Sequence, residues 1–349
     1  MDPSPISVSV ITANFNGLAF LKGYFDALLS TTYPHVNLIM VDNGSTDDSV
    51  AFVSRHYPTV KIISSPTNLG YSGGFNLGID SAQGEILVLL NNDTEVTPGW
   101  LEPLLAEFAT DERIAACQPK ILSLSERTKF EYAGASGGFM DRLGYPFLRG
   151  RVFDTIEEDR GQYQEPVDLF WASGAALAVR RNVLSETGLL DEDFRLHMEE
   201  IDLCWRLHLR GYRIRVAPAA VVYHVGGGTL GQHRARKMYY NHRNGICMLL
   251  KNYSTQRLLW VLPARIALDL VLLVKSLLTL DLKRVAAVAA AYLWLLGHPR
   301  LVLRKRRQVQ RLRKVDDSSL DPVLYAGSIV WDYYLRGRKT FAAIWGPED

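Results

Sequence analysis

The first 120 residues alternate short apolar runs with helical patterns, and this alternation constrains the fold more than any other feature. The apolar runs predict strands at Ile6–Ala13, Val36–Val41, Val60–Ile63, Ile86–Leu90 and Ile114–Cys117. The segments between them predict helices over Leu18–Ser30, Asp47–Tyr57, Phe75–Ala82 and Gly99–Ala109. Strands that are apolar on both faces belong in a sheet that helices cover on two sides. The sequence therefore predicts an α/β fold, Rossmann-like, with a mostly parallel sheet and helices on both faces.

Four successive predicted strands end in small, amide or carboxylate residues, which are Asn14–Gly17, Asp42–Asp47, Asn68–Gly74 and Asn91–Asp93. Any one of these loops is also compatible with an ordinary turn. Four of them at the carboxyl edge of one sheet favour a polar cleft for a nucleotide, because ligands bind at that edge. No G-x-G-x-x-G follows the first strand and no G-x-x-x-x-G-K-[ST] occurs, so dinucleotide and P-loop chemistry lose their main support.

The formal charge of +2 hides an uneven distribution. Ten basic residues and no acidic one lie between Leu282 and Lys314, so the rest of the chain is net acidic. Three separate cysteines, with no C-x-x-C, indicate neither a zinc site nor a disulfide framework. The N-terminus lacks the pattern of a signal peptide, and we expect a cytoplasmic protein.

The C-terminal region combines apolar helical patterns with this basic run. Leu258–Leu280 is interrupted by charges, and Val285–Gly297 is too short to span a bilayer. Apolar helices beside a cationic run predict a membrane-associating appendage that lies on an anionic leaflet. A soluble helical subdomain or a dimer interface, and hence a homo-oligomer, stays open as an alternative. We expect no nucleic acid partner, because no nucleic-acid-binding module is present.

Eight segments in a fixed order carry a family resemblance over roughly residues 6–250. They are Val8–Gly17, Val41–Ser49, Asn68–Ile79, Leu89–Val96, Trp171–Arg181, Leu190–Tyr212, Val222–Thr229 and Tyr239–Asn244. The chain resembles the inverting GT-A glycosyltransferases of family 2, especially the rhamnosyltransferase-like branch. The resemblance implies a GT-A domain over residues 1–255, with a nucleotide-sugar half of about 1–118 and an acceptor half of about 119–255. The basic helical region is then residues 256–349.

The resemblance also implies a nucleotide-sugar site. Asp42 would accept a hydrogen bond from the N3–H that uracil and thymine share, so UDP and dTDP donors both stay open. Arg243, with Lys237 or Tyr240, would lie near the diphosphate. The implied nucleotide-sugar residues are Thr12, Asn14, Asn16, Asp42, Asn43, Gly44, Asn68, Gly70, Gly73, Asn76, Asn91, Asn92 and Arg243. Asp93 and His224 resemble the family's metal ligands, and their chemistry suits Mg²⁺ or Mn²⁺.

An acidic segment, Glu199-Glu200-Ile201-Asp202, opens a predicted helix. Acids in a first helical turn are commonly surface groups that complement the helix dipole. The resemblance instead makes Glu200 the general base, with Glu199 as the alternative. Glu199 and Asp202, three residues apart, share a helix face. The implied acceptor-binding residues are Trp171, Ser173, Gly174 and Asp202, although Trp171 is equally compatible with an ordinary core position.

These observations give one main hypothesis and two alternatives. The main one is a metal-dependent inverting glycosyltransferase, with dTDP-L-rhamnose as the favoured donor and a lipid-linked or cell-surface glycan as acceptor. It would act as a peripheral protein at the cytoplasmic face of the cell membrane. The first alternative is a non-catalytic sugar-nucleotide-binding or scaffold protein, because Asn91 and Glu200 replace the family's usual aspartates. A nucleotidyltransferase ranks last, because Asn14–Gly17 carries no basic residue.

Overall fold

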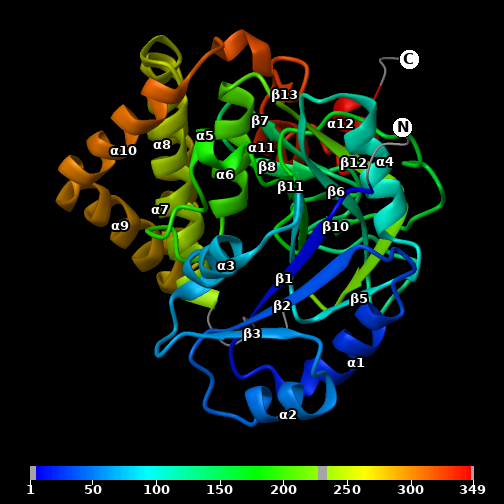
Figure 1. Cartoon of the computed structure of the whole chain (residues 1–349). Coiled ribbons are helices and arrows are strands. Elements are labelled where there is room, and N and C mark those ends of the chain that lie inside the picture. The colour runs from blue at the N-terminus through cyan, green and yellow to red at the C-terminus, as the bar shows by residue number, and fades with distance from the viewer. Residues whose placement is uncertain (1–4, 227–233, 347–349) are drawn as a thin grey trace.

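An eight-stranded sheet forms the centre of the protein, which a computed structural model describes over residues 5–226 and 234–346. The strand order is β3-β2-β1-β4-β11-β6-β12-β5 (Figure 1). The strands are β1 (Val8–Asn14), β2 (Val36–Asp42), β3 (Lys61–Ser64), β4 (Ile86–Leu90), β5 (Thr94–Val96), β6 (Ile114–Ser123), β11 (Ala176–Arg180) and β12 (Arg213–His224).

The pairing within this sheet is mixed. The first four strands are mutually parallel, as predicted, but β11 runs antiparallel to both β4 and β6, and β5 antiparallel to β12. The prediction of a mostly parallel sheet therefore holds for six strands, because β6 and β12 pair in parallel and run in the same direction as β4, whereas β11 and β5 are reversed and make the sheet mixed. A parallel connection needs a crossover, usually a helix. β11 instead enters the sheet from a second, smaller sheet, so it can join in the opposite direction.

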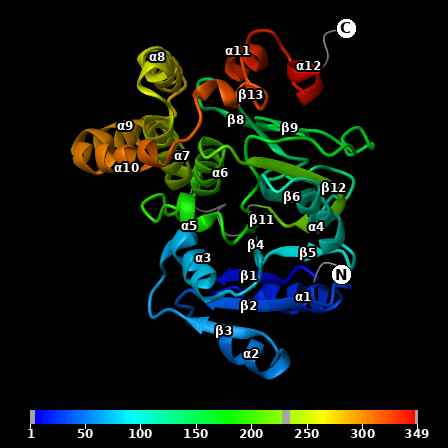
Figure 2. The ribbon, with the colours of Figure 1, turned by 45° about the horizontal axis from the view of Figure 1, so that its top comes forward.

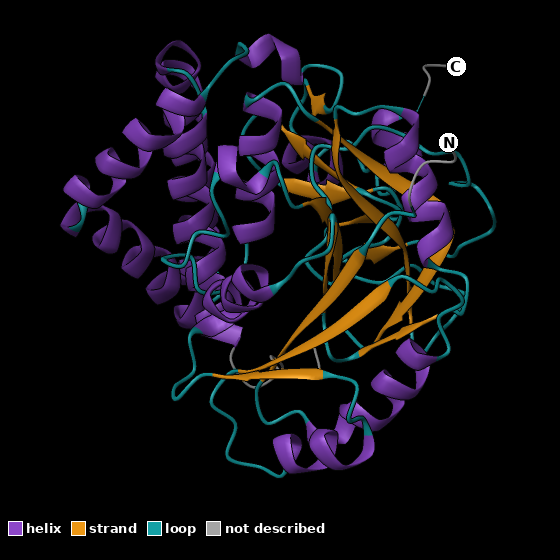
Figure 3. Ribbon diagram, in the orientation of Figure 1, coloured by secondary structure: helices purple, strands orange, loops and turns teal. Residues whose placement is uncertain are grey.

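Helices cover both faces of the sheet, as predicted (Figure 3). Phe25 and Phe108 bury the helices of one face against the sheet, and Phe75 and Trp205 bury those of the other. On the first face lie α1 (Leu18–Leu29), α2 (Ser49–His56) and α4 (Leu101–Thr110), and on the second lie α3 (Gly70–Ser81), α5 (Leu184–Thr187) and α6 (Glu199–Leu209). This layering leaves the carboxyl ends of β1, β2 and β4 free to carry polar loops.

A second sheet of five short strands, β10-β9-β8-β7-β13, was not predicted. Its strands are β7 (Gly138–Asp141), β8 (Pro146–Leu148), β9 (Arg151–Val152), β10 (Thr155–Ile156) and β13 (Leu324–Tyr325). β13 comes from the C-terminal region and pairs in parallel with β7. The helices α11 (Ile329–Tyr334) and α12 (Phe341–Trp345) follow it, and the Phe341 ring lies 4.9 Å from that of Phe139. The C-terminal elements β13, α11 and α12 thus lie against the second sheet, far in sequence from its other strands (Figure 2).

The remaining C-terminal helices gather on one side of the sheet, coloured yellow to orange in Figure 1. They are α7 (Arg234–Asn252), α8 (Thr255–Leu278), α9 (Leu282–Gly297) and α10 (Pro299–Leu312), followed by a 3₁₀ turn, Asp317–Leu320. Ser254 and Asp281 cap α8 and α9 by accepting bonds from the backbone N–H groups of Arg257 and Arg284. No single described helix is both long and apolar enough to cross a membrane, whereas α9 and α10 meet that test only together, as a pair bent by 77°.

Candidate active site

Polar side chains tie together the carboxyl ends of β1, β2 and β4. Asn14 is fully buried, and its Oδ1 accepts a hydrogen bond from Asn92 Nδ2 at 2.8 Å. Asn16 Oδ1 accepts from the backbone N–H of Thr46 at 2.7 Å, while Asp42 Oδ1 accepts from that of Ser45 at 3.2 Å. The structure therefore brings these predicted nucleotide-site residues to one edge of the sheet.

The loop before α3 closes on the same edge. Asn43 donates from Nδ2 to the carbonyl of Gly70 at 2.9 Å, and Asn68 Oδ1 accepts from the Gly70 N–H at 2.8 Å. Gly44 and Gly70 both have left-handed backbones, with φ of +78° and +76°. A side chain on Gly44 would also lie 2.8 Å from the backbone of Thr67. These glycines keep the loop close to the strand ends, which any larger residue would prevent.

Asp93 and His224 face each other next to this edge, with Asp93 Oδ1 3.0 Å from His224 Nε2. The other imidazole nitrogen, Nδ1, lies 3.4 Å from the carboxylate of Glu131, a buried residue that sequence reasoning missed. Asn91 Nδ2 lies 3.5 Å from the same Nε2. Burial opposes the charged imidazolium, but the contacts with Asp93 and Glu131 outweigh it and raise the pKa of His224 to about 10.

Glu199 and Glu200 form a carboxylate pair at the first turn of α6. Glu199 is 3% exposed, and one carboxylate oxygen of each residue, Oε2, is buried without a hydrogen-bond partner. Within the described residues, no cationic nitrogen lies within 4.0 Å of either carboxylate. Burial raises the pKa of Glu200 to about 7, and burial with the neighbouring charge of Glu200 raises that of Glu199 well above its usual range.

The turn that presents this pair has an unusual backbone. Arg195, His197 and Met198 all have positive φ, between 59° and 71°, which is costly for residues other than glycine. Asn244 of α7 holds the turn by donating from Nδ2 to the carbonyls of Phe194, Leu196 and His197 at 2.8–3.0 Å. The Asn244 amide thus fixes the direction from which the two glutamates enter the site.

A cavity of about 690 Å³ joins these groups. Both glutamates, Asp93 and His224 line it together with Asn91, Trp171, Ser173 and Gly174. Trp171 is 4% exposed, and its indole N–H donates to the carbonyl of Phe139 at 2.9 Å. The cavity therefore places a carboxylate pair, a histidine–aspartate pair and an aromatic wall around one space.

The glycosyl transferase family 2 profile matches residues 9–188, just over half of the chain. The chain belongs to glycosyl transferase family 2. An N-acetylglucosaminyl-diphospho-decaprenol L-rhamnosyltransferase of Mycobacterium tuberculosis is 26% identical over 295 residues, which cover 79% of this chain and 95% of that protein. The pre-mycofactocin glycosyltransferase of the same organism is 29% identical over 244 residues, 68% of this chain and 47% of the relative. This protein is accordingly a glycosyltransferase.

Solved structures show the same fold. GalNAc-T7 with UDP, GalNAc and Mn²⁺ superposes with a TM-score of 0.55 at 16% identity, over 73% of this chain and 49% of that one. The mannosyltransferase PcManGT from Pyrobaculum calidifontis, with GDP-Man and Mn²⁺, gives 0.50 at 15% identity, over 89% and 86% of the two chains. The GT-A fold predicted from the sequence is confirmed.

Four predicted site residues have internal contacts in this glycosyltransferase instead. The Thr12 hydroxyl is buried and bonds to Tyr24 and to the carbonyl of Leu90. The Asn76 amide braces the backbone of Leu190 from both sides. The guanidinium of Arg243 donates to the carbonyls of Asp193 and Phe194 and to Asn244. These side chains hold the backbone around the site through the contacts given, and the fourth residue, Asp202, lies in an ion-pair cluster.

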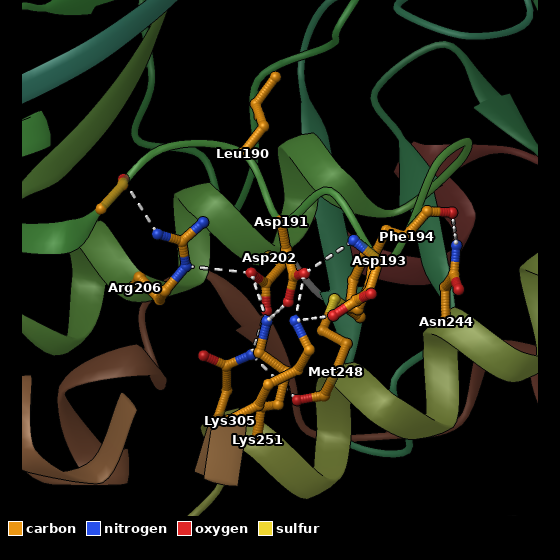
Figure 4. Close-up of polar contacts among 12 residues, drawn as sticks. Leu190, Asp191, Asp193, Phe194, Asp202, Arg206, Asn244, Met248, Lys251 and Lys305 are labelled. Atoms are coloured by element: carbon orange, nitrogen blue, oxygen red, sulfur yellow. Dashed lines mark hydrogen bonds and ion pairs between the residues drawn. The ribbon is translucent and has the colours of Figure 1, made fainter. Parts of the chain in front are cut away.

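We call this group the anchoring cluster: Asp191, Asp202, Arg206, Lys251 and Lys305 (Figure 4). Lys251 of α7 lies 2.5 Å from Asp191 and 3.0 Å from Asp202, and Arg206 lies 3.0 Å from Asp202. Lys305 of α10 lies 2.5 Å from Asp191. Asp202 is fully buried in this cluster and is not among the residues that line the cavity, while the ion pairs of the cluster join α6, α7 and α10.

Sequence reasoning missed Glu131, His197, Asn244 and Lys251. Asn244 is the last residue of the Tyr239–Asn244 segment that resembles the family, and nothing else in the sequence marks it as a functional residue. His197 lines the cavity as a neutral ring, because burial and then the charge of Lys237 lower its pKa to about 4. Glu131 follows β6 in an irregular segment, where no periodicity marks it. The end of the Val222–Thr229 segment lies outside the described residues.

The Asp93–His224 pair fits a divalent cation that the substrate helps to hold. Within the described ranges no group of three or more His, Cys, Asp or Glu side chains is arranged around a metal. Mg²⁺ and Mn²⁺ commonly take one or two protein ligands and complete their shell with phosphate oxygens. The Glu131 carboxylate, 3.4 Å from Nδ1, lies on the side of the ring where metal-binding histidines usually have a carboxylate or carbonyl partner.

Proposed function

We propose that this protein is an inverting glycosyltransferase in which Glu200 acts as the general base. The observation that carries the proposal is the buried carboxylate pair, free of cations among the described residues, in the same cavity as Asp93 and His224. A base whose pKa lies near 7 is well matched to neutral pH. Glu200 takes the proton of the acceptor hydroxyl as its oxygen attacks the anomeric carbon. The bond from that carbon to the nucleoside diphosphate breaks in the same step, which inverts the configuration.

Asp93 and His224 would hold Mg²⁺ or Mn²⁺ beside the diphosphate. When bound, such a cation neutralises the charge that develops on the leaving group. The two solved structures cited above both contain Mn²⁺, which supports a divalent cation but does not identify it in this protein. Asn91 contributes an amide where a carboxylate would add a further negative charge.

For the donor we propose dTDP-L-rhamnose, with Asp42 recognising the thymine. The support is the mycobacterial relative, whose name specifies L-rhamnosyl transfer to a diphospho-decaprenol-linked sugar and which this chain matches over most of its length. UDP-sugars present the same base edge and form the natural comparison. The proposed acceptor class is accordingly a lipid-linked glycan.

We also propose that the C-terminal helices lie on an anionic membrane surface at the cytoplasmic face. Apolar side chains project from α8 and α9, including Leu278 at 81% exposure and Leu296 at 76%. Arg300, Arg304, Arg307 and Arg311 are all exposed and recur every three or four residues, so they form one stripe along α10. An apolar surface beside a cationic stripe matches the charge and polarity of an anionic leaflet.

A panel of dTDP- and UDP-sugars with Mg²⁺, Mn²⁺ or EDTA tests the reaction. We expect metal-dependent transfer with one donor, a product of inverted configuration by NMR, and loss of turnover in Asp93→Ala. Nucleotide-sugar binding by calorimetry with no transfer to any lipid-linked acceptor would instead support a non-catalytic role. A product of retained configuration would exclude the mechanism.

A further inference from the structure

One wall of the 690 Å³ cavity carries a buried cation that the reaction described above does not use. Arg151 of β9 is 9% exposed and lines this cavity. One guanidinium nitrogen, Nη1, donates to the carbonyl of Phe153 at 3.0 Å, while Nε is buried without a hydrogen-bond partner. No carboxylate oxygen lies within 4.0 Å of the guanidinium in the described part of the chain. The side chain therefore has donor capacity left over inside the cavity.

Two other buried arginines of this protein use more of their donors. Arg149 donates to Ser136 and to the carbonyls of Tyr163 and Glu165, and Arg206 to Asp202 and three carbonyls. An uncompensated buried charge is strongly unfavourable, and native proteins pair such groups. Burial lowers the pKa of Arg151, although Tyr132, Glu131 and Asp154 oppose this. Glu131 is already engaged, because it accepts from the Ala133 N–H and faces His224.

A second cation approaches the same place. The guanidinium carbon of Arg151 lies 4.2 Å from the centroid of the Tyr132 ring, and Lys237 Nζ lies 5.0 Å from the same centroid. Lys237 lines the cavity as well. Two cations on one aromatic ring, inside a cavity, fit an anion with several oxygens, since a guanidinium and an ammonium can each bond a different oxygen of a phosphoryl group.

Both cations contact the ring of the residue that follows Glu131, and no ion pair joins either of them to Asp93 in the described part of the chain. Asp93 faces Nε2 of His224, whereas Glu131 faces Nδ1. The ring that the two cations share therefore belongs to the residue next to the Nδ1 neighbour of His224. The cavity wall there is partly apolar and includes Phe153 and Ile156, the latter 40% exposed.

We propose that Arg151 and Lys237 bind a phosphoryl group of the acceptor, an amphiphile whose sugar lies beside Glu200 and whose apolar chain leaves past Phe153 and Ile156. This inference rests on the proposed function and specifies its acceptor. The shared chemistry, a phosphoryl anion, could also come from the donor diphosphate, so the test has to separate the two sources.

The test compares two soluble acceptors that carry the same sugar, one on a short-chain lipid diphosphate and one as a neutral alkyl glycoside. We expect Arg151→Gln to lower kcat/KM for the diphosphate acceptor by about 10- to 100-fold, the range for lost charge-assisted hydrogen bonds. The neutral glycoside should change by less than about twofold, since it makes no such bond. Arg151→Lys should restore part of the loss. The matched control is Arg127→Gln, which removes an arginine that is paired with Glu95 and is not among the residues lining the cavity, and it should leave both acceptors unaffected.

Donor hydrolysis without acceptor separates failure of this inference from failure of the proposed function. An Arg151→Gln enzyme that hydrolyses donor normally and discriminates against the diphosphate acceptor supports the site. A raised donor KM would assign the cations to the donor, and an equal loss for both acceptors would make Arg151 structural; either overturns the inference. Should Arg151→Gln not fold, Lys237→Gln takes its place. If the wild-type enzyme shows no transfer, calorimetry with the diphosphate amphiphile still tests the site. The Arg151→Gln variant should then bind the amphiphile more weakly than wild type, and equal binding would overturn the inference.

Discussion

Helix α6 separates two groups of buried acids that differ in their neighbours. Glu199 and Glu200 face the cavity and have no cation within 4.0 Å in the described residues. Asp202, on the same first turn, lies with Asp191 in the anchoring cluster between Lys251, Lys305 and Arg206 (Figure 4). Each group has one buried residue, Glu199 or Asp202, and one half-buried residue, Glu200 or Asp191, so burial alone does not distinguish the two groups.

The difference shows in how readily the carboxylates ionise. Burial opposes ionisation of Asp191, but Lys251 and Lys305 outweigh it and hold the pKa of that carboxyl well below its usual range. The pKa of Glu200 rises to about 7 because no cation offsets the same penalty. Asp191 and Asp202 therefore hold helices together through ion pairs. Glu199 and Glu200, which have no cation beside them among the described residues, can instead take up a proton.

The largest expected effect is on catalysis. Glu200→Gln keeps the size of the side chain and removes its basicity, so kcat should fall by about 10²- to 10⁴-fold. Circular dichroism and donor binding should match wild type. Glu199→Gln, measured in parallel, decides which glutamate is the base. More than half of wild-type turnover in both variants would refute the assignment.

The anchoring cluster should respond through stability instead. Asp202→Asn leaves the buried Arg206 without its ion-pair partner and leaves Lys251 with Asp191 alone, and removing one partner of a buried ion pair typically costs about 3–5 kcal/mol. We expect that loss in urea unfolding, with activity falling only as the folded fraction falls. A variant as stable as wild type but inactive would return Asp202 to the acceptor site that the sequence suggested.

The pH dependence of stability should have opposite sign at the two sites. Glu200 titrates near its ordinary 4.5 when unfolded and near 7 when folded, so the native state loses stability as pH rises between these values. Asp191 stabilises the native state above its ordinary 3.8, and this contribution is lost as pH falls through and below that value. The free energy of unfolding should be measured from about pH 3 to 8. That of Glu199→Gln/Glu200→Gln should increase relative to wild type as pH rises. That of Asp191→Asn should increase relative to wild type only at the acid end of this range.

Sequence reasoning found β1 to β4 and β6, the polar strand ends and both glutamates, because these follow from local pattern or from motif order, but it missed the second sheet. It placed Glu199 and Asp202 on one helix face, yet Glu199 lines the cavity and Asp202 does not. The i, i+3 spacing predicts neighbouring positions on a helix but not what packs against each of them. The partner that decides the role of Asp202, Lys251, lies 49 residues away on another helix. Long-range charge pairing of this kind leaves no periodic signal.

The smallest effects distinguish two neighbouring cations of α10. Arg304 belongs to the exposed stripe, whereas Lys305 turns inward to Asp191. Arg304→Gln/Arg307→Gln should weaken binding to anionic vesicles by about 1 kcal/mol per residue at low salt, with kcat unchanged. Lys305→Gln should bind vesicles like wild type but unfold at lower urea, because Asp191 keeps only Lys251 from the anchoring cluster. A loss of vesicle binding in Lys305→Gln that is half that of the double variant, and so equal per charge removed, would mean that binding depends on total charge and not on the face on which α10 presents it.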